Sequence, residues 1–294
     1  MTPSGTLPRA HVGRLLISCP DRPGIVAAVS RFLFEHGANV LDSSQHSTDP
    51  SGGVFFMRMV FHLDALDVSR AQLESDFESR VAEPFDMTWR VAYGDRRKRL
   101  AIFVSRLDHC LLELLWRVRA GEIDADIVLV VSNHGDLEEL VASFGIAFVR
   151  LHVTPETKVA QEGLALARLE SERVDGVVLA RYMQILTSDF VNRYQERIIN
   201  IHHSFLPSFV GADPYRRAYE RGVKLIGATA HFVTDALDEG PIVEQDVRRV
   251  SHKESVGDLT RIGRDAERSV LARAVRAFVE DRVLVYANKT IVFD

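Results

Sequence analysis

The stretch Ile198-Ile199-Asn200-Ile201-His202-His203-Ser204-Phe205-Leu206-Pro207 begins as an apolar strand and ends at a proline. Successive side chains of a strand point to opposite faces, so Asn200 and His202 are predicted to share one face, with His203 on the other. An amide can donate to a developing oxyanion, and an imidazole with an ordinary pKa of about 6.5 can move protons near neutral pH. This strand face therefore carries groups suited to acyl transfer.

The chain after this stretch is expected to supply a carboxylate. Gly211 and Pro214 are predicted to keep an open turn. Farther on, the apolar strand Leu225–Val233 leads into a polar loop closed by Gly and Pro, which holds Asp238 near the Asn/His face. The residues alone leave two interpretations open: a catalytic trio, or two satisfied polar strand residues and a turn-forming aspartate.

Short apolar strands and helices alternate through this half of the chain. Strands are predicted at 101–105, 127–132, 147–151, 174–180 and 198–202, and helices at 109–120, 137–144, 157–172 and 188–194. An extended stretch at 242–250, a long helix at 256–280 and a strand at 283–286 follow. Apolar strands separated by helices indicate a mainly parallel sheet covered on both faces, a Rossmann-like α/β domain. Its sites lie at the carboxyl ends of strands, where His202 is placed.

The N-terminal part has a different pattern. Strands are predicted at 14–19, 39–47, 54–62 and 87–92, and helices at 25–36 and 69–82. The order βαββαβ is typical of a ferredoxin-like domain. We therefore divide the chain into a domain at 11–93, a charged linker at 94–99 and a second domain at 100–294.

Three motifs carry a resemblance to a known family: the stretch quoted above, Gly-Ala-Thr-Ala-His-Phe-Val at 227–233 and Leu-Asp-Glu-Gly-Pro-Ile at 237–242. From Leu100 onward, the chain closely resembles the folate-dependent formyltransferase superfamily, and within it the formyltetrahydrofolate deformylases. The resemblance implies that Asn200, His202 and Asp238 are catalytic and that His203 is the deformylase variant of the motif. It also implies hydrolysis of 10-formyltetrahydrofolate to formate and tetrahydrofolate, which supplies formate for purine and one-carbon metabolism. Our hypothesis is that Asp238 activates the water and that Asn200 and His202 stabilise the oxyanion; no metal or other cofactor is expected.

The same resemblance implies a place for the folate substrate. Its binding residues are expected at Arg181, Met183, Gln184, Ile185 and Leu186, whose main-chain groups would hold the pterin ring. From the residues alone, the apolar members of this group are typical of core positions. His231 is expected to contact the site, either orienting the aspartate or filling the sheet. The roles of Arg106 and Asp213 stay open.

The N-terminal domain resembles an ACT domain, through Asp-Arg-Pro-Gly-Ile at 21–25 and Gly-Ala-Asn-Val at 37–40. The resemblance implies a free amino-acid effector held by Asp21, Pro23, Gly24, Ile25 and Asn39, and a homo-oligomer, either a dimer or a tetramer. The first N–H groups of a helix favour a carboxylate, which suits such an effector. On the residues alone, Pro-Gly before a helix also indicates plain chain reversal. The effector's identity and sign are not predicted.

Composition limits the other functions. The net charge is 36 − 41 = −5, which gives no basic excess for a nucleic-acid partner. Cys19 and Cys110 are the two cysteines, which suggests neither a disulfide framework nor a thiolate metal site and fits a cytoplasmic protein. No signal peptide or membrane span is expected. Four scattered histidines are expected on the surface or in loops: His109, His134, His152 and His252.

Two alternatives remain. A formyltransferase acting on an amine acceptor is disfavoured where the acceptor is a phosphorylated ribonucleotide, because residues 103–109, Phe-Val-Ser-Arg-Leu-Asp-His, offer no glycine for a phosphate-binding loop. A methionyl-tRNA formyltransferase would need a basic C-terminal domain beyond Asp294. The other alternative is a non-catalytic amino-acid sensor.

Overall fold

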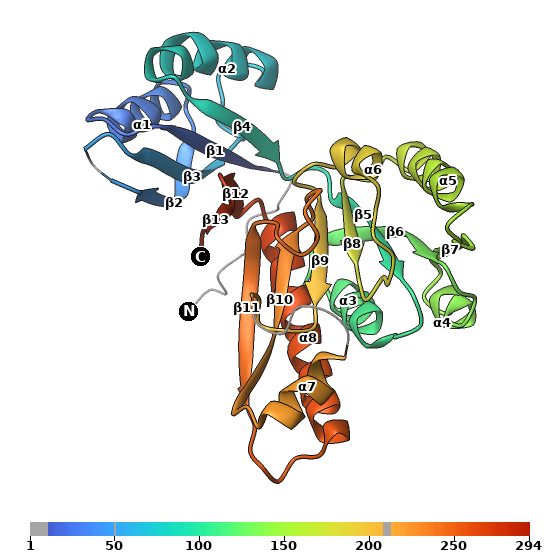
Figure 1. The fold of residues 1–294 in the computed structure, drawn as a ribbon. Helices are drawn as coiled ribbons and strands as arrows, with labels where there is room; N and C mark the ends of the chain where they lie inside the picture. The colour runs from blue at the N-terminus through green and yellow to red at the C-terminus, as the bar shows by residue number, and fades with distance from the viewer. Residues whose placement is uncertain (1–10, 50, 208–212) are drawn as a thin grey trace, which may run out of the picture. The chain divides into compact units, whose positions relative to one another are not determined.

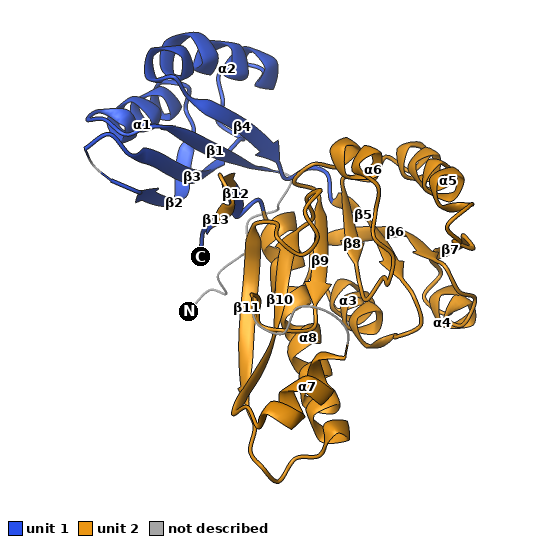
Figure 2. Ribbon diagram, in the orientation of Figure 1, with its two compact units in different colours: residues 1–97, 281–284, 291–294 blue, residues 98–280, 285–290 orange. Residues whose placement is uncertain are grey.

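The computed structural model describes residues 11–49, 51–207 and 213–294, which form two compact units (Figures 1 and 2). The first unit contains the described residues up to Arg97 together with Asp281–Leu284 and Ile291–Asp294. The second contains Lys98–Glu280 and Val285–Thr290. The sequence places all residues after 99 in one domain, but Arg58 donates from Nε to the carbonyl oxygen of Asp281 at 2.9 Å and so ties part of the C-terminal segment to the first unit.

The first unit has the expected ferredoxin-like fold. Its strands are β1 (Val12–Pro20), β2 (Asn39–Ser47), β3 (Val54–His62) and β4 (Thr88–Tyr93), and its helices are α1 (Ile25–Glu35) and α2 (Arg70–Phe77). The strands form an antiparallel sheet in the order β2-β3-β1-β4. Apolar residues of the sheet and of both helices share one core, because Ile17 packs in the same cluster as Val29 and Phe77. The predicted helix 69–82 is α-helical from Arg70 to Phe77, and a π-helix at Glu78–Ala82 continues it.

The second unit is a mixed sheet between helices, as expected. Its strands are β5 (Lys98–Val104), β6 (Ala125–Ser132), β7 (Ala147–Arg150), β8 (Gly176–Leu179), β9 (Ile198–His202), β10 (Leu225–Phe232) and β11 (Ile242–Arg249). The helices are α3 (His109–Arg119), α4 (Glu138–Ala142), α5 (Lys158–Ser171), α6 (Ser188–Arg193), α7 (Pro214–Arg221) and α8 (Val256–Val279). The order is β11-β10-β9-β8-β5-β6-β7, and β5 to β9 are mutually parallel. The sheet is therefore mainly parallel. A hairpin of β12 (Val283–Tyr286) and β13 (Lys289–Val292) ends the chain.

One feature of this unit differs from the prediction. Helix α7 was not predicted, because Pro214 was assigned to an open turn. Proline instead occupies the first turn of α7, where its fixed φ suits a helix and no N–H is needed. Gly211, the other turn residue, lies outside the described residues. The strand β10 runs antiparallel to β9 and places Thr229 opposite His202 and His231 opposite Asn200.

Helix α8 is the longest helix among the described residues, and one side of it is buried. Ser255 and Asp258 form a reciprocal capping box at its start. Its buried stripe includes Leu259, Val270 and Ala274, and it packs against β10, β9 and β11. In the described part of the chain, no helix has the length and apolarity needed to cross a membrane.

Candidate active site

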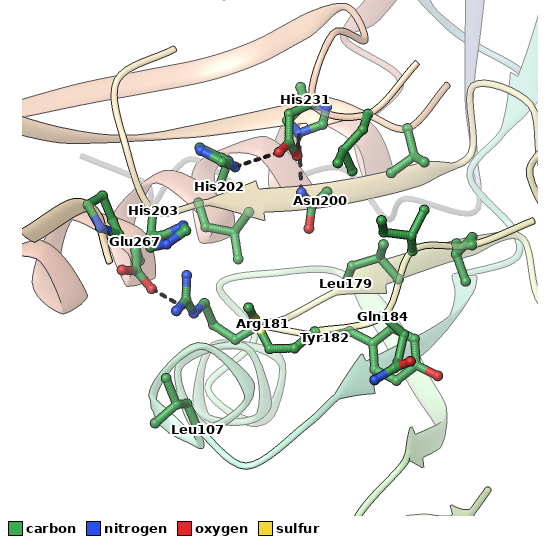
Figure 3. Close-up of a pocket in the computed structure, with 18 of the residues that line it drawn as sticks. Leu107, Leu179, Arg181, Tyr182, Gln184, Asn200, His202, His203, His231 and Glu267 are labelled. Carbon is green, nitrogen blue, oxygen red and sulfur yellow. Dashed lines mark hydrogen bonds and ion pairs between the residues drawn. The ribbon is translucent and has the colours of Figure 1, made fainter. Parts of the chain in front are cut away.

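A cavity of about 580 Å³ opens at the carboxyl ends of β8 and β9, where a mainly parallel sheet is expected to hold its site. Residues that follow these strands line it, together with the loop at 234–238 and residues of α7 and α8. The three predicted catalytic residues, Asn200, His202 and Asp238, all line this cavity. The structure thus brings together groups from β9 and from the loop after β10 (Figure 3).

Asn200 is oriented by its cross-strand neighbour. Nδ1 of His231 donates to the carbonyl oxygen of Phe232 at 2.9 Å, so Nε2 of His231 carries the lone pair. The amide of Asn200 donates to that Nε2 at 3.2 Å. His231 is buried at 2% exposure, so both contacts are held inside the sheet. One amide hydrogen of Asn200 is fixed in this way, and the second is available to a substrate oxygen.

Asp238 joins the two histidines. Its carboxylate lies 3.3 Å from Nδ1 of His202 and 3.6 Å from Nε2 of His231. The contact with His202 and then the contact with His231 hold the pKa of Asp238 well below its ordinary value, although partial burial opposes them. Asp238 itself has a positive φ of 57°, so its backbone is held in the left-handed region. Nε2 of His202 is buried without a hydrogen-bond partner among the described residues.

The predicted folate loop also lines the cavity. Arg181, Met183, Gln184, Ile185 and Leu186 all contribute to its wall. Met183 is 62% exposed and Ile185 is 60% exposed, so these two side chains are not core residues. They lie where an apolar ligand surface could cover them.

Buried polar groups anchor this loop at both ends. The backbone N–H of Met183 donates to Oγ of Ser105 at 2.9 Å, and Ser105 in turn donates to Asn133 at 2.8 Å. At the far end, the buried carboxylate of Glu162 accepts hydrogen bonds from the backbone and hydroxyl of Thr187. The loop is therefore preorganised before any ligand binds.

His203 was predicted to point away from the His202 face, and this prediction is wrong. Both side chains line the cavity, with ring centroids 5.0 Å apart. Strand β9 ends at His202, so the alternation of the strand no longer applies to the next residue. Burial, with the nearby positive charge of Arg181 and the ring of His202, lowers the pKa of His203 to about 4.

A buried cluster around Glu267 was not predicted. Oε2 of Glu267 accepts a hydrogen bond from His109 at 2.8 Å, and Oε1 accepts one from Tyr215 at 2.6 Å. Nε of Arg181 lies 3.5 Å from the same carboxylate. His109 was assigned to the surface or a loop, but its side chain is only 9% exposed. The missed signal is a carboxylate, Glu267, on the buried stripe of α8.

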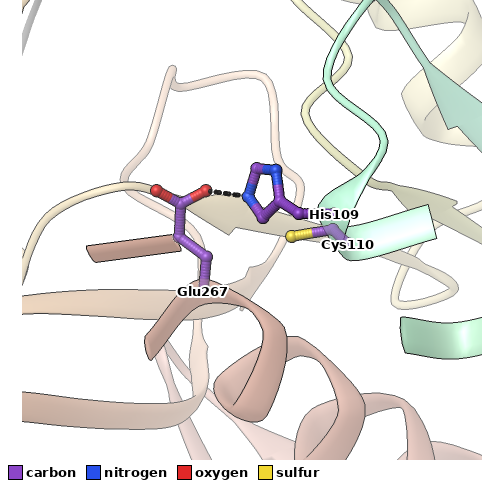
Figure 4. A group of neighbouring side chains, drawn as sticks. All are labelled: His109, Cys110 and Glu267. Carbon is purple, nitrogen blue, oxygen red and sulfur yellow. Dashed lines mark hydrogen bonds and ion pairs between the residues drawn. The ribbon is translucent and has the colours of Figure 1, made fainter. Parts of the chain in front are cut away.

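His109, Cys110 and Glu267 also bring three metal-ligand types within 4.8 Å of one another (Figure 4). Both oxygens of Glu267 already accept protein hydrogen bonds, and the Arg181 guanidinium would repel a cation. Burial raises the pKa of the Cys110 thiol well above its ordinary value, and the negative charge of Glu267 adds to this. The chemistry of the cluster is that of a buried ion pair.

The remaining predicted residues lie as follows. Arg106 forms an ion pair with Asp136 at 3.7 Å, and Asp213 lines the cavity and pairs with Arg216 at 2.9 Å. The predicted effector residues are in the first unit and surround the start of α1 and of β2: Asp21, Pro23, Gly24, Ile25 and Asn39. Gly24 has φ 98° at the helix start, Ile25 is buried, and Asp21 accepts a hydrogen bond from Ser47 of β2.

The fold and the site define the class of the protein. The formyl transferase family model matches residues 98–275, and the ACT domain model matches residues 13–75. The second unit is therefore a formyltransferase-type domain that follows an ACT domain.

Relatives along nearly the whole chain define the family more closely. The formyltetrahydrofolate deformylase of Bacillus subtilis (strain 168) is 56% identical over 96% of this chain and 94% of its own length. A solved formyltetrahydrofolate deformylase from Pseudomonas syringae pv. tomato has a TM-score of 0.93 at 48% identity, covering 97% of this chain and 95% of that one. A solved glycinamide ribonucleotide transformylase 1 from Symbiobacterium toebii has a TM-score of 0.63 at 30% identity, covering 67% and 95%. This chain belongs to the formyltetrahydrofolate deformylase family.

Proposed function

We propose that this chain hydrolyses 10-formyltetrahydrofolate to formate and tetrahydrofolate. The observation that carries the proposal is that Asn200, His202 and Asp238 line one cavity in a chain of the deformylase family. The folate is assigned to the loop that begins at Arg181, whose exposed Met183 and Ile185 offer an apolar surface to the pterin ring. Hydrolysis changes no oxidation state, so the reaction calls for no redox cofactor.

The proposed mechanism assigns the proton transfer to His202. Asp238 was our hypothesis for the base, but a carboxylate whose pKa is lowered is a weak base. Its contact with Nδ1 of His202 instead leaves Nε2 of that ring to take a proton from water, and its charge stabilises the imidazolium that forms. Asp238 is then a group that orients and stabilises His202.

The chemical steps follow from these assignments. The oxygen of water bonds to the formyl carbon while His202 accepts one of its protons. The second amide hydrogen of Asn200 donates to the oxyanion, which is the interaction that grows strongest in the transition state. When the bond between the formyl carbon and the folate nitrogen breaks, His202 returns the proton to that nitrogen. Formic acid leaves and loses its remaining proton to solvent.

For the first unit, we propose that an amino-acid effector binds near the start of α1 and that the chain forms a homo-oligomer. Support comes from the ACT domain match and from Gly24, which leaves the first N–H groups of α1 without a side-chain cap. Calorimetric titration with the common amino acids and sedimentation of the protein would test the two statements separately.

One assay tests the proposed function. The protein is incubated with 10-formyltetrahydrofolate alone, and formate and tetrahydrofolate are measured. Release of both products in equal amounts, without an amine acceptor, is the expected result. Release only after an amine is added would favour a transferase, and no release under either condition would favour a sensor.

A further inference from the structure

The Glu267 cluster, defined as Glu267 with His109, Arg181 and Tyr215, forms part of the wall of the catalytic cavity. The carboxylate of Glu267 is 1% exposed and is held by groups from three different segments. The mechanism proposed above gives it no chemical step. A buried charge is costly to keep, so a cluster of this kind inside a catalytic cavity calls for an explanation.

The cluster has a defined place relative to the reacting groups. Figure 3 shows Glu267, Arg181 and His203 on one side of the face that carries His202 and Asn200, and Leu179, Tyr182 and Gln184 on the other. The second side is the one assigned to the folate, because it holds Gln184 of the folate loop; of Arg181, the main-chain group was assigned to the pterin, and its side chain lies on the first side. The first side is therefore where the formyl acceptor must approach.

The backbone of α8 is adapted to the cluster. A Cβ at Gly263 would lie 2.1 Å from the hydroxyl oxygen of Tyr215 and 2.3 Å from its ring, so the tyrosine reaches Glu267 only because that position is glycine. Burial raises the pKa of Glu267, but the hydrogen bond from His109, the charge of Arg181 and the hydrogen bond from Tyr215 together hold it below its ordinary value. The cluster is thus packed and ionised rather than open.

We propose that the Glu267 cluster restricts the formyl acceptor to water by filling the acceptor side of the cavity. This inference rests on the proposed function. Arg181 and Glu267 are specificity-determining residues in this view, and neither exchanges protons with the substrate. Water carries no substituent, while a primary amine brings a substituent that the cluster excludes.

The reaction that the cluster excludes is transfer of the formyl group to an amine, which could use the same catalytic groups. The nitrogen of an amine would bond to the formyl carbon, and the bond between that carbon and the folate nitrogen would break. One N–H proton of the amine would pass through His202 to the folate nitrogen. The products would be a formamide and tetrahydrofolate, so the cluster decides between two reactions that share one mechanism.

Two variants open the wall in different ways. Arg181 has φ 62°, a conformation that glycine adopts without strain, so Arg181→Gly removes the side chain while favouring the native backbone. Glu267→Gln keeps the shape of the carboxylate and releases the charge that holds Arg181. Each variant, and the wild type, is supplied with 10-formyltetrahydrofolate and glycinamide in weakly alkaline buffer. Formate and N-formylglycinamide are then quantified by mass spectrometry.

The ratio of N-formylglycinamide to formate is the decisive readout. We expect it to rise about 10-fold in Arg181→Gly, the usual size of steric discrimination in a pocket, and by a smaller factor in Glu267→Gln. The matched control is Arg99→Ala, which removes another partly buried arginine of an Arg–Glu ion pair, at 3.1 Å from Glu172, outside the cavity. Its ratio should equal that of the wild type.

The outcomes separate the two proposals. A folded variant in which both products fall together, with the wild-type ratio, would show that the cluster is merely structural and would overturn the inference. If one variant fails to fold in a thermal scan, the other decides. A wild type that releases no formate in the absence of glycinamide would overturn the proposed function itself, and the inference with it.

Discussion

The amide nitrogen of Asn200 lies 3.2 Å from Nε2 of His231, the residue opposite it on the antiparallel strand β10. This relationship fixes which way the amide points, because Nδ1 of His231 is already committed to the carbonyl oxygen of Phe232. A strand pairing therefore sets the geometry of the proposed oxyanion donor. The same histidine touches Asp238, so one buried ring serves two residues of the site.

The first prediction concerns the oxyanion. Asn200→Ala should lower kcat about 10²- to 10³-fold, since one preorganised donor is lost from the transition state. Formate release and circular dichroism would be measured together. Asn192→Ala, at an exposed position on α6, is the control and should keep the parent rate. A folded Asn200→Ala protein with full activity would remove Asn200 from the mechanism.

The second prediction tests whether His231 acts through its neighbours. His231→Phe keeps a ring of similar size but removes the nitrogens that contact Asn200 and Asp238. We expect kcat/KM to fall about 10- to 100-fold, because a small misplacement of catalytic groups has this effect. Combined with Asn200→Ala, the two losses should be less than multiplicative. Fully independent effects in that cycle would contradict the positioning role.

The third prediction concerns charge at Asp238. Asp238→Asn preserves the shape of the side chain but removes the carboxylate that stabilises a protonated His202. The rate should fall about 10²- to 10⁴-fold, the range for disabled acid–base catalysis. Glu239→Gln, the exposed neighbouring carboxylate, is the control. Turnover at the parent rate by Asp238→Asn would show that the ion pair with His202 is not needed.

The fourth prediction concerns the folate loop. Ser105→Ala removes the acceptor for the backbone N–H of Met183 and the donor to Asn133. Of these two hydrogen bonds, the one from Met183 holds the loop, and its loss costs about 1 kcal/mol, which corresponds to about a 5-fold rise in KM if the loop must be reordered on binding. Steady-state kinetics should show a larger change in KM than in kcat. The control is Ser143→Ala, at an exposed serine at the end of α4, and it should leave KM unchanged. An unchanged KM in Ser105→Ala would mean that the loop keeps its shape without Ser105.

The fifth prediction concerns pH and stability. The pKa of His203 is about 4 in the folded protein and about 6.5 in an unfolded chain, so the unfolded state binds more protons between these values. The contribution of His203 to stability is therefore complete above its pKa in the unfolded chain, and it is lost as pH falls toward its pKa in the folded protein. When the pH falls from about 7.5 to about 5, the unfolding free energy of the wild type should drop by on the order of 2 kcal/mol more than that of His203→Gln. Urea unfolding curves would measure this, and equal losses would refute it.

The secondary structure was largely predictable because it depends on neighbours in the chain. The alternation in β9 and the apolar stripe of α8 are local patterns, and both elements lie where they were expected. Two local predictions failed at strand ends and turns. His203 turned into the cavity because β9 had already ended, and Pro214 began a helix instead of keeping a turn open.

The sequence by itself determined the two fold types, the strand that carries Asn200 and His202, and the polar loop that carries Asp238, because spacing and turn residues act over a few positions. Only the tertiary structure decided that His231 would orient Asn200 and that Glu267 would meet His109, which is 158 residues away in the chain. Such contacts depend on strand register and helix packing. No local pattern of residues encodes strand register or helix packing. The contacts of the buried Glu267 carboxylate on α8 are therefore seen only in the folded protein.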